Sequence, residues 1–215
     1  MSRPLRLATL VFGALLFTAP AYAQVSDAQE VVRDAAATIH TMRTWPGFAK
    51  AGLLRRAKAV LVFPNVVKAG FVVGAEGGQG VLLAHRGGGW SDPAFYVMGS
   101  LTLGPQVGGQ IGPVVLIIMS QRAYDALLGS NTFSLKATAD LAVVDFARIS
   151  EAPLTPPDIV VWTHAAGLFA GLTVGGTDIK QRTEYDEAYY GRPVTAAQIV
   201  TGARAPGARA LRGSL

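Results

Sequence analysis

The sequence predicts a single α+β domain: a predominantly antiparallel, glycine-rich β-sandwich or barrel-like sheet, with N-terminal amphipathic helices and short C-terminal helices. Three observations predict this class. Apolar side chains recur at helical spacing over residues 26–56, whereas short apolar runs between Gly and Pro turns dominate residues 59–177. The chain is 50% hydrophobic and 15% charged, which is sufficient to build a large core. Glycine repeated inside the β runs is typical of strongly bent strands.

Two helices are expected before the sheet. Ser26 or Asp27 can cap the first, which follows helical spacing to about Thr44 and is broken by Trp45-Pro46-Gly47. The second covers residues 48–56 and mixes apolar with basic side chains. Such a helix either lies on a lipid surface or packs on the sheet, and packing is favoured because most amphipathic helices turn their apolar face inward.

The β region begins with a strand at residues 59–63 that ends at Pro64. Residues 68–83 follow, and their two apolar arms are expected to form a hairpin around a glycine-dense bend. This stretch is not a phosphate-binding P-loop, because strand-forming residues follow Gly80 where a P-loop has Lys, Ser or Thr and a helix. Further strands are expected at 94–103, 106–112, 114–119, 133–144, 159–163 and 168–177, and helices after Ser120 and Thr195.

The first 23 residues are expected to be a signal peptide. Arg3 and Arg6 precede an apolar run at residues 7–17, and Ala21-Tyr22-Ala23 fits a signal-peptidase site. Cleavage after Ala23 would place the protein in the periplasm or outside the cell. The chain contains no Cys, so disulfides and thiolate metal sites are excluded.

The remaining chain is expected to form one domain, residues 24–201. It is followed by residues 202–215, which are rich in Arg, Ala, Gly and Pro and are expected to be a disordered basic tail.

Positive charge is concentrated in one part of the chain. The formal net charge is +5, and removing Arg3 and Arg6 lowers it to +3. No acidic residue lies between Asp34 and Glu76, where the sequence carries Arg43, Lys50, Arg55, Arg56, Lys58 and Lys68. A local basic block on a weakly charged chain predicts contact with an anionic surface such as acidic lipid headgroups. Trp45 and Phe48 are the aromatic residues expected to insert at such an interface.

Catalytic patterns are missing from the sequence. It has no Gly-x-Ser-x-Gly elbow, and His40, His85 and His164 lack the spacing of metal ligands, so no metal or cofactor is expected. Glu76, Asp92 and Asp178 are candidate acids for a cryptic hydrolase, although each also suits a turn. Nucleic acid is not expected as a partner, because exposed aromatics do not alternate with the basic residues.

A set of ordered motifs resembles the SYLF domain family. They are Pro64…Lys68-Ala-Gly-Phe71…Gly74, Gly78-x-Gly80-Val81, Gly89-Trp90-Ser-x-Pro93, the glycines at 99, 104, 108 and 112, Phe133-Ser-Leu135, Gly167…Gly171, and Ala188-Tyr-Tyr190-Gly191. The likeness covers about residues 30–201. Gly70 belongs to the first of these motifs, and the glycines, Trp90, Pro93 and Tyr190 are interpreted as structural positions. The chain departs from the family pattern at Gly112-Pro113 and at residues 141–148.

The resemblance implies binding of phosphoinositides and other acidic lipids, with actin binding in some eukaryotic members. It carries no catalytic residues. Its membrane-contacting region maps onto Lys50, Arg55, Arg56, Lys58 and Lys68. The leading expectation is therefore a non-enzymatic, peripheral lipid-binding protein of a bacterial envelope. The alternatives are an envelope structural or protein-interaction module without lipid contact, and the cryptic hydrolase. The sequence specifies neither the lipid nor the oligomeric state.

Overall fold

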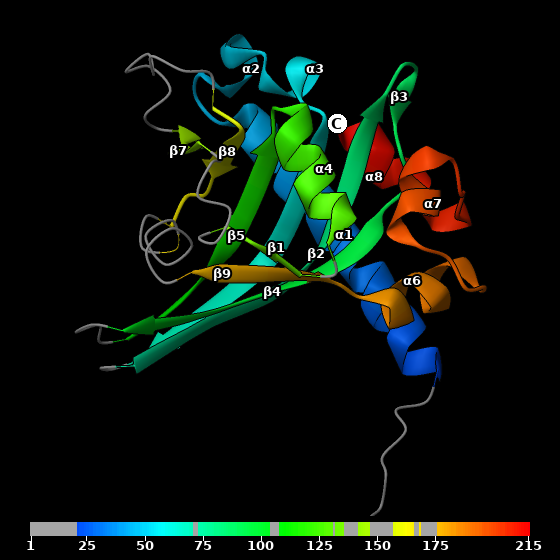
Figure 1. Ribbon diagram of the computed structural model, residues 1–215, viewed down its shortest axis with the longest axis horizontal. Coiled ribbons are helices and arrows are strands. Elements are labelled where there is room, and N and C mark those ends of the chain that lie inside the picture. The colour runs from blue at the N-terminus through cyan, green and yellow to red at the C-terminus, as the bar shows by residue number, and fades with distance from the viewer. Residues whose placement is uncertain are drawn as a thin grey trace, which may run out of the picture.

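The fold is built on one curled, mainly antiparallel sheet (Figure 1). It is seen in a computed structural model, which describes residues 21–70, 73–103, 108–130, 132–135, 142–146, 157–165, 168 and 176–215. The strands are β1 (Ala59–Gly70), β2 (Val73–Arg86), β3 (Gly89–Trp90), β4 (Ala94–Leu103), β5 (Gly108–Ile118), β6 (Thr132–Ser134), β7 (Val143–Asp145), β8 (Ile159–Trp162) and β9 (Thr177–Gln181). Their order is β6-β9-β4-β2-β1-β5-β8-β7, with β3 on β2. Among the strands of the described residues, only the β7–β8 pair is parallel.

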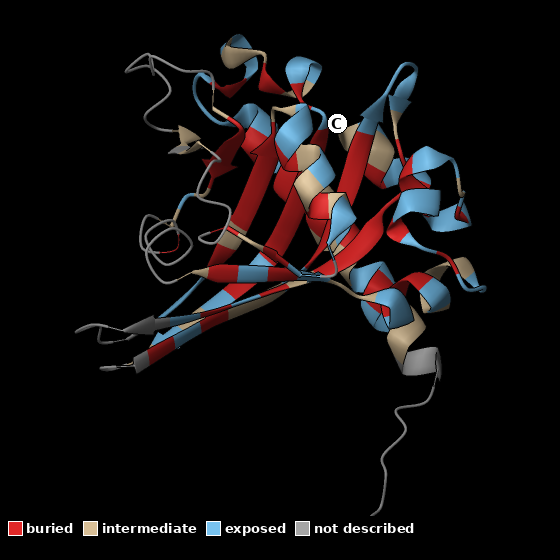
Figure 2. Cartoon of the chain, in the orientation of Figure 1, coloured by how far each residue is buried: buried red, intermediate tan, exposed pale blue. Residues whose placement is uncertain are grey.

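Helices cover both faces of this sheet (Figures 1 and 2). One face packs against α1 (Ala21–Thr44), α2 (Phe48–Ala51), α3 (Leu53–Arg56), α6 (Thr183–Tyr190) and α8 (Arg209–Ser214). The other packs against α4 (Gln121–Gly129) and α7 (Ala196–Thr201). The α+β prediction is confirmed, and the sheet is the barrel-like alternative. A second sheet is not needed, because helices supply the apolar covering on each side.

Strand β1 shows why both faces must be covered. Ala59, Leu61 and Phe63 contribute to one buried cluster, whereas Val60 and Val62 contribute to the cluster on the opposite face. Because successive side chains of a strand point to opposite faces, an unbroken apolar run is stable only when both faces are dry.

The glycine-rich stretch differs from the predicted bend. Strand β2 runs through it without a break, and the ladder between β1 and β2 reaches as far as the pair Gly70 and Gly74. Gly78 and Gly80 instead face a bulge in β1, where the register shifts between Val62 and Val67. A Cβ on Gly80 would lie 2.3 Å from the carbonyl oxygen of Val62, so glycine is required here for close approach of the two backbones.

Two predicted strand ends are also wrong, because the strands continue through proline at a bulge. Strand β1 continues through Pro64 to Gly70, and β5 continues through Pro113 to Ile118. The register between β1 and β5 shifts between Phe63 and Val66, where a proline is tolerated because a bulge leaves some ladder positions unpaired.

The N-terminal helix is longer than predicted. It begins at Ala21, so it passes through the predicted cap at Ser26 and Asp27 and through the predicted cleavage site after Ala23. Residues 1–20 lie outside the described residues, and the signal peptide stays a prediction. Within the part of the chain that the structure describes, no helix is both long and apolar enough to span a bilayer.

The prediction of a disordered tail at residues 202–215 is wrong. A short 3-10 helix (Pro206–Ala208) and α8 lie there, and Ala208 and Leu211 are fully buried. Leu211 joins the cluster beneath α1, and Arg43 of α1 donates to the carbonyl oxygen of Ser214 over 2.8 Å. Composition suggested disorder, but a few well-placed apolar side chains suffice to order a short segment on an existing core.

Candidate functional site

The basic residues of α2 and α3 gather at one end of the sheet. These two helices form the predicted second helix, divided at Gly52, whose left-handed conformation (φ 61°) lets the chain change direction. Lys50, Arg55, Arg56 and Lys58 are all exposed, and none of them forms an ion pair with another described residue. We call these four residues the basic end.

The two aromatic residues predicted to insert in lipid have different environments. Trp45 is 40% exposed and sits beside the basic end, with its ring edge-on to Trp162 at 5.7 Å and stacked on His164 at 6.4 Å. Phe48 is only 3% exposed and packs on Phe146 with 5.3 Å between ring centroids. Phe48 is thus a core residue in this structure, and α2 packs on the sheet as favoured above.

Lys68 does not join the basic end. Lys58 precedes β1 and Lys68 lies near the far end of the same strand, so they are separated by ten residues or about 30 Å at about 3.3 Å per residue. Lys68 is half-buried between Gln110 and Glu76, its partners on the neighbouring strands. The sequence grouped Lys68 with the basic end, but strand β1 places Lys68 at the opposite end of the sheet.

Arg86 lies near Lys58 along the sheet but does not join the basic end. The antiparallel register places His85 next to Lys58, whose carbonyl oxygen accepts a hydrogen bond of 2.8 Å from the His85 backbone N–H. The His85 ring stacks on Trp90 at 4.7 Å, which holds this corner against β3. Arg86 follows and is exposed. Its side chain lies beside Gly202 and Tyr124, so it points to the face of the sheet that α4 and α7 cover, opposite to α2 and α3.

The motif residues interpreted as structural positions lie mainly where two strands pair or where a helix meets a strand. Tyr190 donates to the carbonyl oxygen of Pro93 over 3.1 Å, which ties α6 to the start of β4. Gly191 ends α6 in the left-handed region (φ 67°). Gly70, Gly74, Gly78 and Gly80 lie in the β1–β2 hairpin. Gly167 and Gly171 lie outside the described residues.

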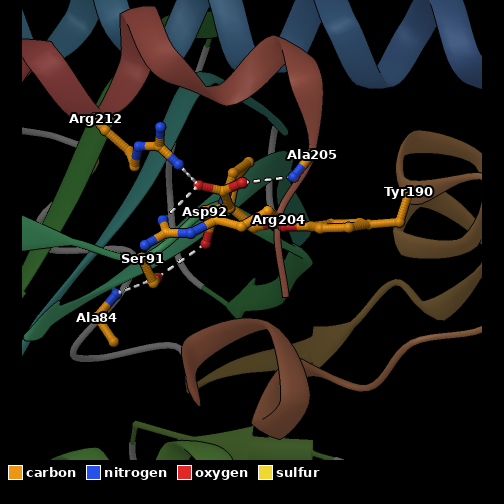
Figure 3. Close-up of polar contacts among 8 residues, drawn as sticks. Ala84, Ser91, Asp92, Tyr190, Arg204, Ala205 and Arg212 are labelled. Carbon is orange, nitrogen blue, oxygen red and sulfur yellow. Dashed lines mark hydrogen bonds and ion pairs between the residues drawn. The ribbon is translucent and has the colours of Figure 1, made fainter. Parts of the chain in front are cut away.

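The candidate hydrolytic acids do not come together. Asp92 is fully buried, and its carboxylate accepts hydrogen bonds from the Ala205 backbone N–H at 2.6 Å, from Arg204 at 3.2 Å and from Arg212 (Figure 3). These three contacts anchor the C-terminal segment. Asp178 is exposed on β9, and its side chain points to the sheet face opposite to that of Thr177.

Glu76 is the most unusual of the three acids. It is 3% exposed, and neither carboxylate oxygen has a hydrogen-bond partner among the described residues. Burial raises its pKa to about 7, against an opposing effect from Lys68. Its neighbour across the strands is Ser100, whose hydroxyl is also buried and has no hydrogen-bond partner in the described ranges. Asp92 lies two residues before Ala94, which pairs with Leu82 about 20 Å along β2 from Glu76, so these two acids do not meet.

Metal ligands are equally dispersed. No group of three or more His, Cys, Asp or Glu side chains within the described ranges is arranged to hold a metal ion. His40 lies exposed on α1, His85 stacks on Trp90 and His164 stacks on Trp45.

Comparison with known proteins defines the family. The family model Ysc84, described as "Las17-binding protein actin regulator", matches residues 99–215, which is more than half of the chain. The chain therefore belongs to the Ysc84 family, which is the SYLF family indicated by its motifs. No solved structure matches.

Named relatives come from fungi and vertebrates. Protein YSC84 of Saccharomyces cerevisiae is 29% identical over 156 residues, covering 70% of this chain and 33% of that protein. LAS seventeen-binding protein 3 of the same yeast is 29% identical over 156 residues, covering 70% and 34%. SH3 domain-containing YSC84-like protein 1 of Xenopus laevis is 29% identical over 155 residues, covering 70% and 46%. The chain thus spans less than half the length of these relatives, one of which is named as a binding protein.

Proposed function

We propose that this protein binds anionic membrane surfaces peripherally, without catalysis, and that it does so at a bacterial envelope membrane after export. The observation that carries the proposal is the basic end: four exposed cations with no ion-pair partner among the described residues, beside the exposed ring of Trp45.

The expected attachment is electrostatic and of moderate strength. Each Lys or Arg near an acidic lipid surface contributes about 1 kcal/mol, so the four residues of the basic end supply up to about 4 kcal/mol. Trp45 adds an aromatic ring of the kind that sits at headgroup level. Phe48 contributes nothing here, because it is packed inside the protein. Binding that depends on exposed charges weakens as salt rises, since the Debye length falls from about 10 Å at 0.1 M to about 3 Å at 1 M.

Vesicle co-sedimentation tests the proposal. The protein that begins at Gln24, the predicted mature start, is expected to pellet with vesicles of phosphatidylglycerol or phosphoinositide and to remain in solution with phosphatidylcholine. The triple variant R55E/R56E/K58E is expected to lose at least tenfold in affinity, since it replaces attraction by repulsion at three positions.

A matched control changes the same charge elsewhere. Arg33, Lys180 and Arg192 are exposed and lie outside the basic end, so R33E/K180E/R192E has the same net charge but keeps the proposed surface. Equal loss in both triple variants would show that net charge alone matters. Equal pelleting with neutral and anionic vesicles would refute the proposal.

Protein binding is the second candidate function. It is favoured by the names of the relatives, one of which is a Las17-binding protein by title. It predicts no vesicle binding under any of these conditions and a specific protein captured by the same basic end, which R55E/R56E/K58E would release and R33E/K180E/R192E would retain.

A further inference from the structure

The far end of the sheet exposes an apolar face on the α1 side. We call it the apolar shelf. Val67 pairs with Ile111 across β1 and β5, and Ala75 pairs with Leu101 across β2 and β4, so these side chains share one face. Leu101 and Ile111 are each 70% exposed and Val67 is 49% exposed. The alternation of exposed and buried residues along these projecting strands is visible in Figure 2.

These strands bury polar side chains and expose apolar ones, which is the reverse of what the hydrophobic effect favours. On the face opposite to the apolar shelf, the same strands bury Glu76 and Ser100, although neither side chain has a hydrogen-bond partner among the described residues. Burying unpaired polar groups while exposing Leu and Ile is costly. A one-residue slip of register would invert both faces, so the observed register selects an outward apolar surface.

Acidic side chains of α1 flank this shelf. Asp27, Glu30 and Asp34 recur at spacings of three and four residues, which places them on one side of the helix. Together with Asn65, Val67 and the glycines of β2 they line a groove of about 360 Å³. Asn65 donates to Asp34 over 2.8 Å, and none of the three acids forms an ion pair with a described basic residue.

Asp27, Glu30 and Asp34 form an acidic wall beside the shelf. The negative charge of this wall determines which kind of molecule can bind there. An anionic membrane would be repelled by three carboxylates, so the shelf is unsuited to the lipid surface proposed for the basic end. Two copies packed shelf to shelf would oppose identical acidic walls. The occupant must therefore be basic and partly apolar.

The chain itself carries such a surface at the opposite end of the sheet. The basic end has four cations and the exposed ring of Trp45. It lies about 30 Å from the shelf along β1, so one molecule cannot cover its own shelf.

We infer that two copies of this protein associate head to tail, with the basic end of one copy docked in the acidic groove and on the apolar shelf of the next. Such a contact pairs different surfaces on the two copies, so each added copy leaves one of each surface free and the association continues into chains. Lipid and a second copy then compete for the same basic end, which links self-association to the membrane binding proposed above.

Sedimentation velocity on the purified protein, without lipid, tests this inference. The weight-average mass is expected to rise with concentration at low salt and to return to that of a monomer at high salt. The variants D27K/E30K/D34K and R55E/R56E/K58E are each expected to weaken association at least tenfold, because each places like charges on the two contacting surfaces. An equimolar mixture of the two is expected to associate again, since every groove then meets an oppositely charged end.

Controls separate this outcome from misfolding and from net charge. D125K/E184K/E187K reverses three exposed acids that do not line the groove and is expected to associate like the wild type. L101S/I111S is expected to weaken association without any change of charge. A wild type that is monomeric at every concentration and salt overturns the inference, as does a mixture of folded reversed variants that stays monomeric. Vesicle binding by the monomer would then still stand, so the two proposals fail separately.

Discussion

Gly80 provides a sharp test of how the β1–β2 hairpin is built. An added Cβ would lie 2.3 Å from the Val62 carbonyl oxygen and 2.5 Å from Cδ1 of Phe63. Ordinary contacts begin near 3.4 Å, so the Gly80→Ala change forces the two strands apart by about 1 Å beside the bulge. Gly99, on the adjacent strand β4, offers a control because a Cβ there meets nothing within 4 Å.

The magnitude follows from the strands that must move. Overpacking a well-packed region costs about 1–3 kcal/mol. Separation of the backbones adds about 1 kcal/mol for each ladder hydrogen bond that lengthens. Gly80→Ala is therefore expected to lower the free energy of unfolding by about 3 kcal/mol or more. For a domain of this size, that corresponds to a fall in Tm of about 6–12 °C. Gly99→Ala is expected to be neutral or to stabilise by up to about 1 kcal/mol, because it reduces unfolded-chain entropy.

Urea denaturation of both variants, followed by circular dichroism, measures the difference. The slope with urea should stay the same, since neither change alters the surface exposed on unfolding. If Gly80→Ala loses less than about 1 kcal/mol, or no more than Gly99→Ala, then close backbone approach is not the reason for glycine at this position.

Two further predictions concern buried carboxylates. The raised pKa of Glu76, about 7 against 4.5 when unfolded, means that its contribution to stability is present below pH 4.5 and is lost as pH rises through 7. Glu76→Gln is therefore expected to match the wild type near pH 4.5. Near pH 8 it should be about 3 kcal/mol more stable, since each pKa unit corresponds to about 1.4 kcal/mol. Stability measured by urea denaturation that changes equally with pH in both proteins would contradict the burial argument. Asp92→Asn removes the charge that holds Arg204 and Arg212, so trypsin is expected to cleave the 203–215 segment faster, whereas Asp178→Asn at an exposed site should leave the rate unchanged. Equal cleavage rates in the two variants would show that Asp92 does not anchor this segment.

The sequence predicted helix caps correctly where both partners of the capping hydrogen bond lie within one short stretch. Ser120 caps α4 by accepting from the Ala123 N–H at 3.1 Å, and Thr195 caps α7 in a capping box with Gln198. Strand β4 has the predicted bounds. These features depend on neighbours within four residues, so they are visible in a linear pattern.

Features that depend on distant partners were missed. Asp92 meets Arg204, Ala205 and Arg212 across 112, 113 and 120 residues of chain, so a segment expected to be disordered is held in place. The glycines of β2 were expected to make a bend, but their role depends on the bulge in β1 opposite them.

By itself, the sequence determined the α+β class, the family and the cluster of basic residues on α2 and α3. Only the tertiary structure decided that Phe48 is buried, that Lys68 is carried to the far end of β1, and that Leu101 and Ile111 face outward beside an acidic wall. The physical reason is that composition and periodicity report what a segment can bury. The register between strands and the packing of helices on them decide which side chains are finally covered.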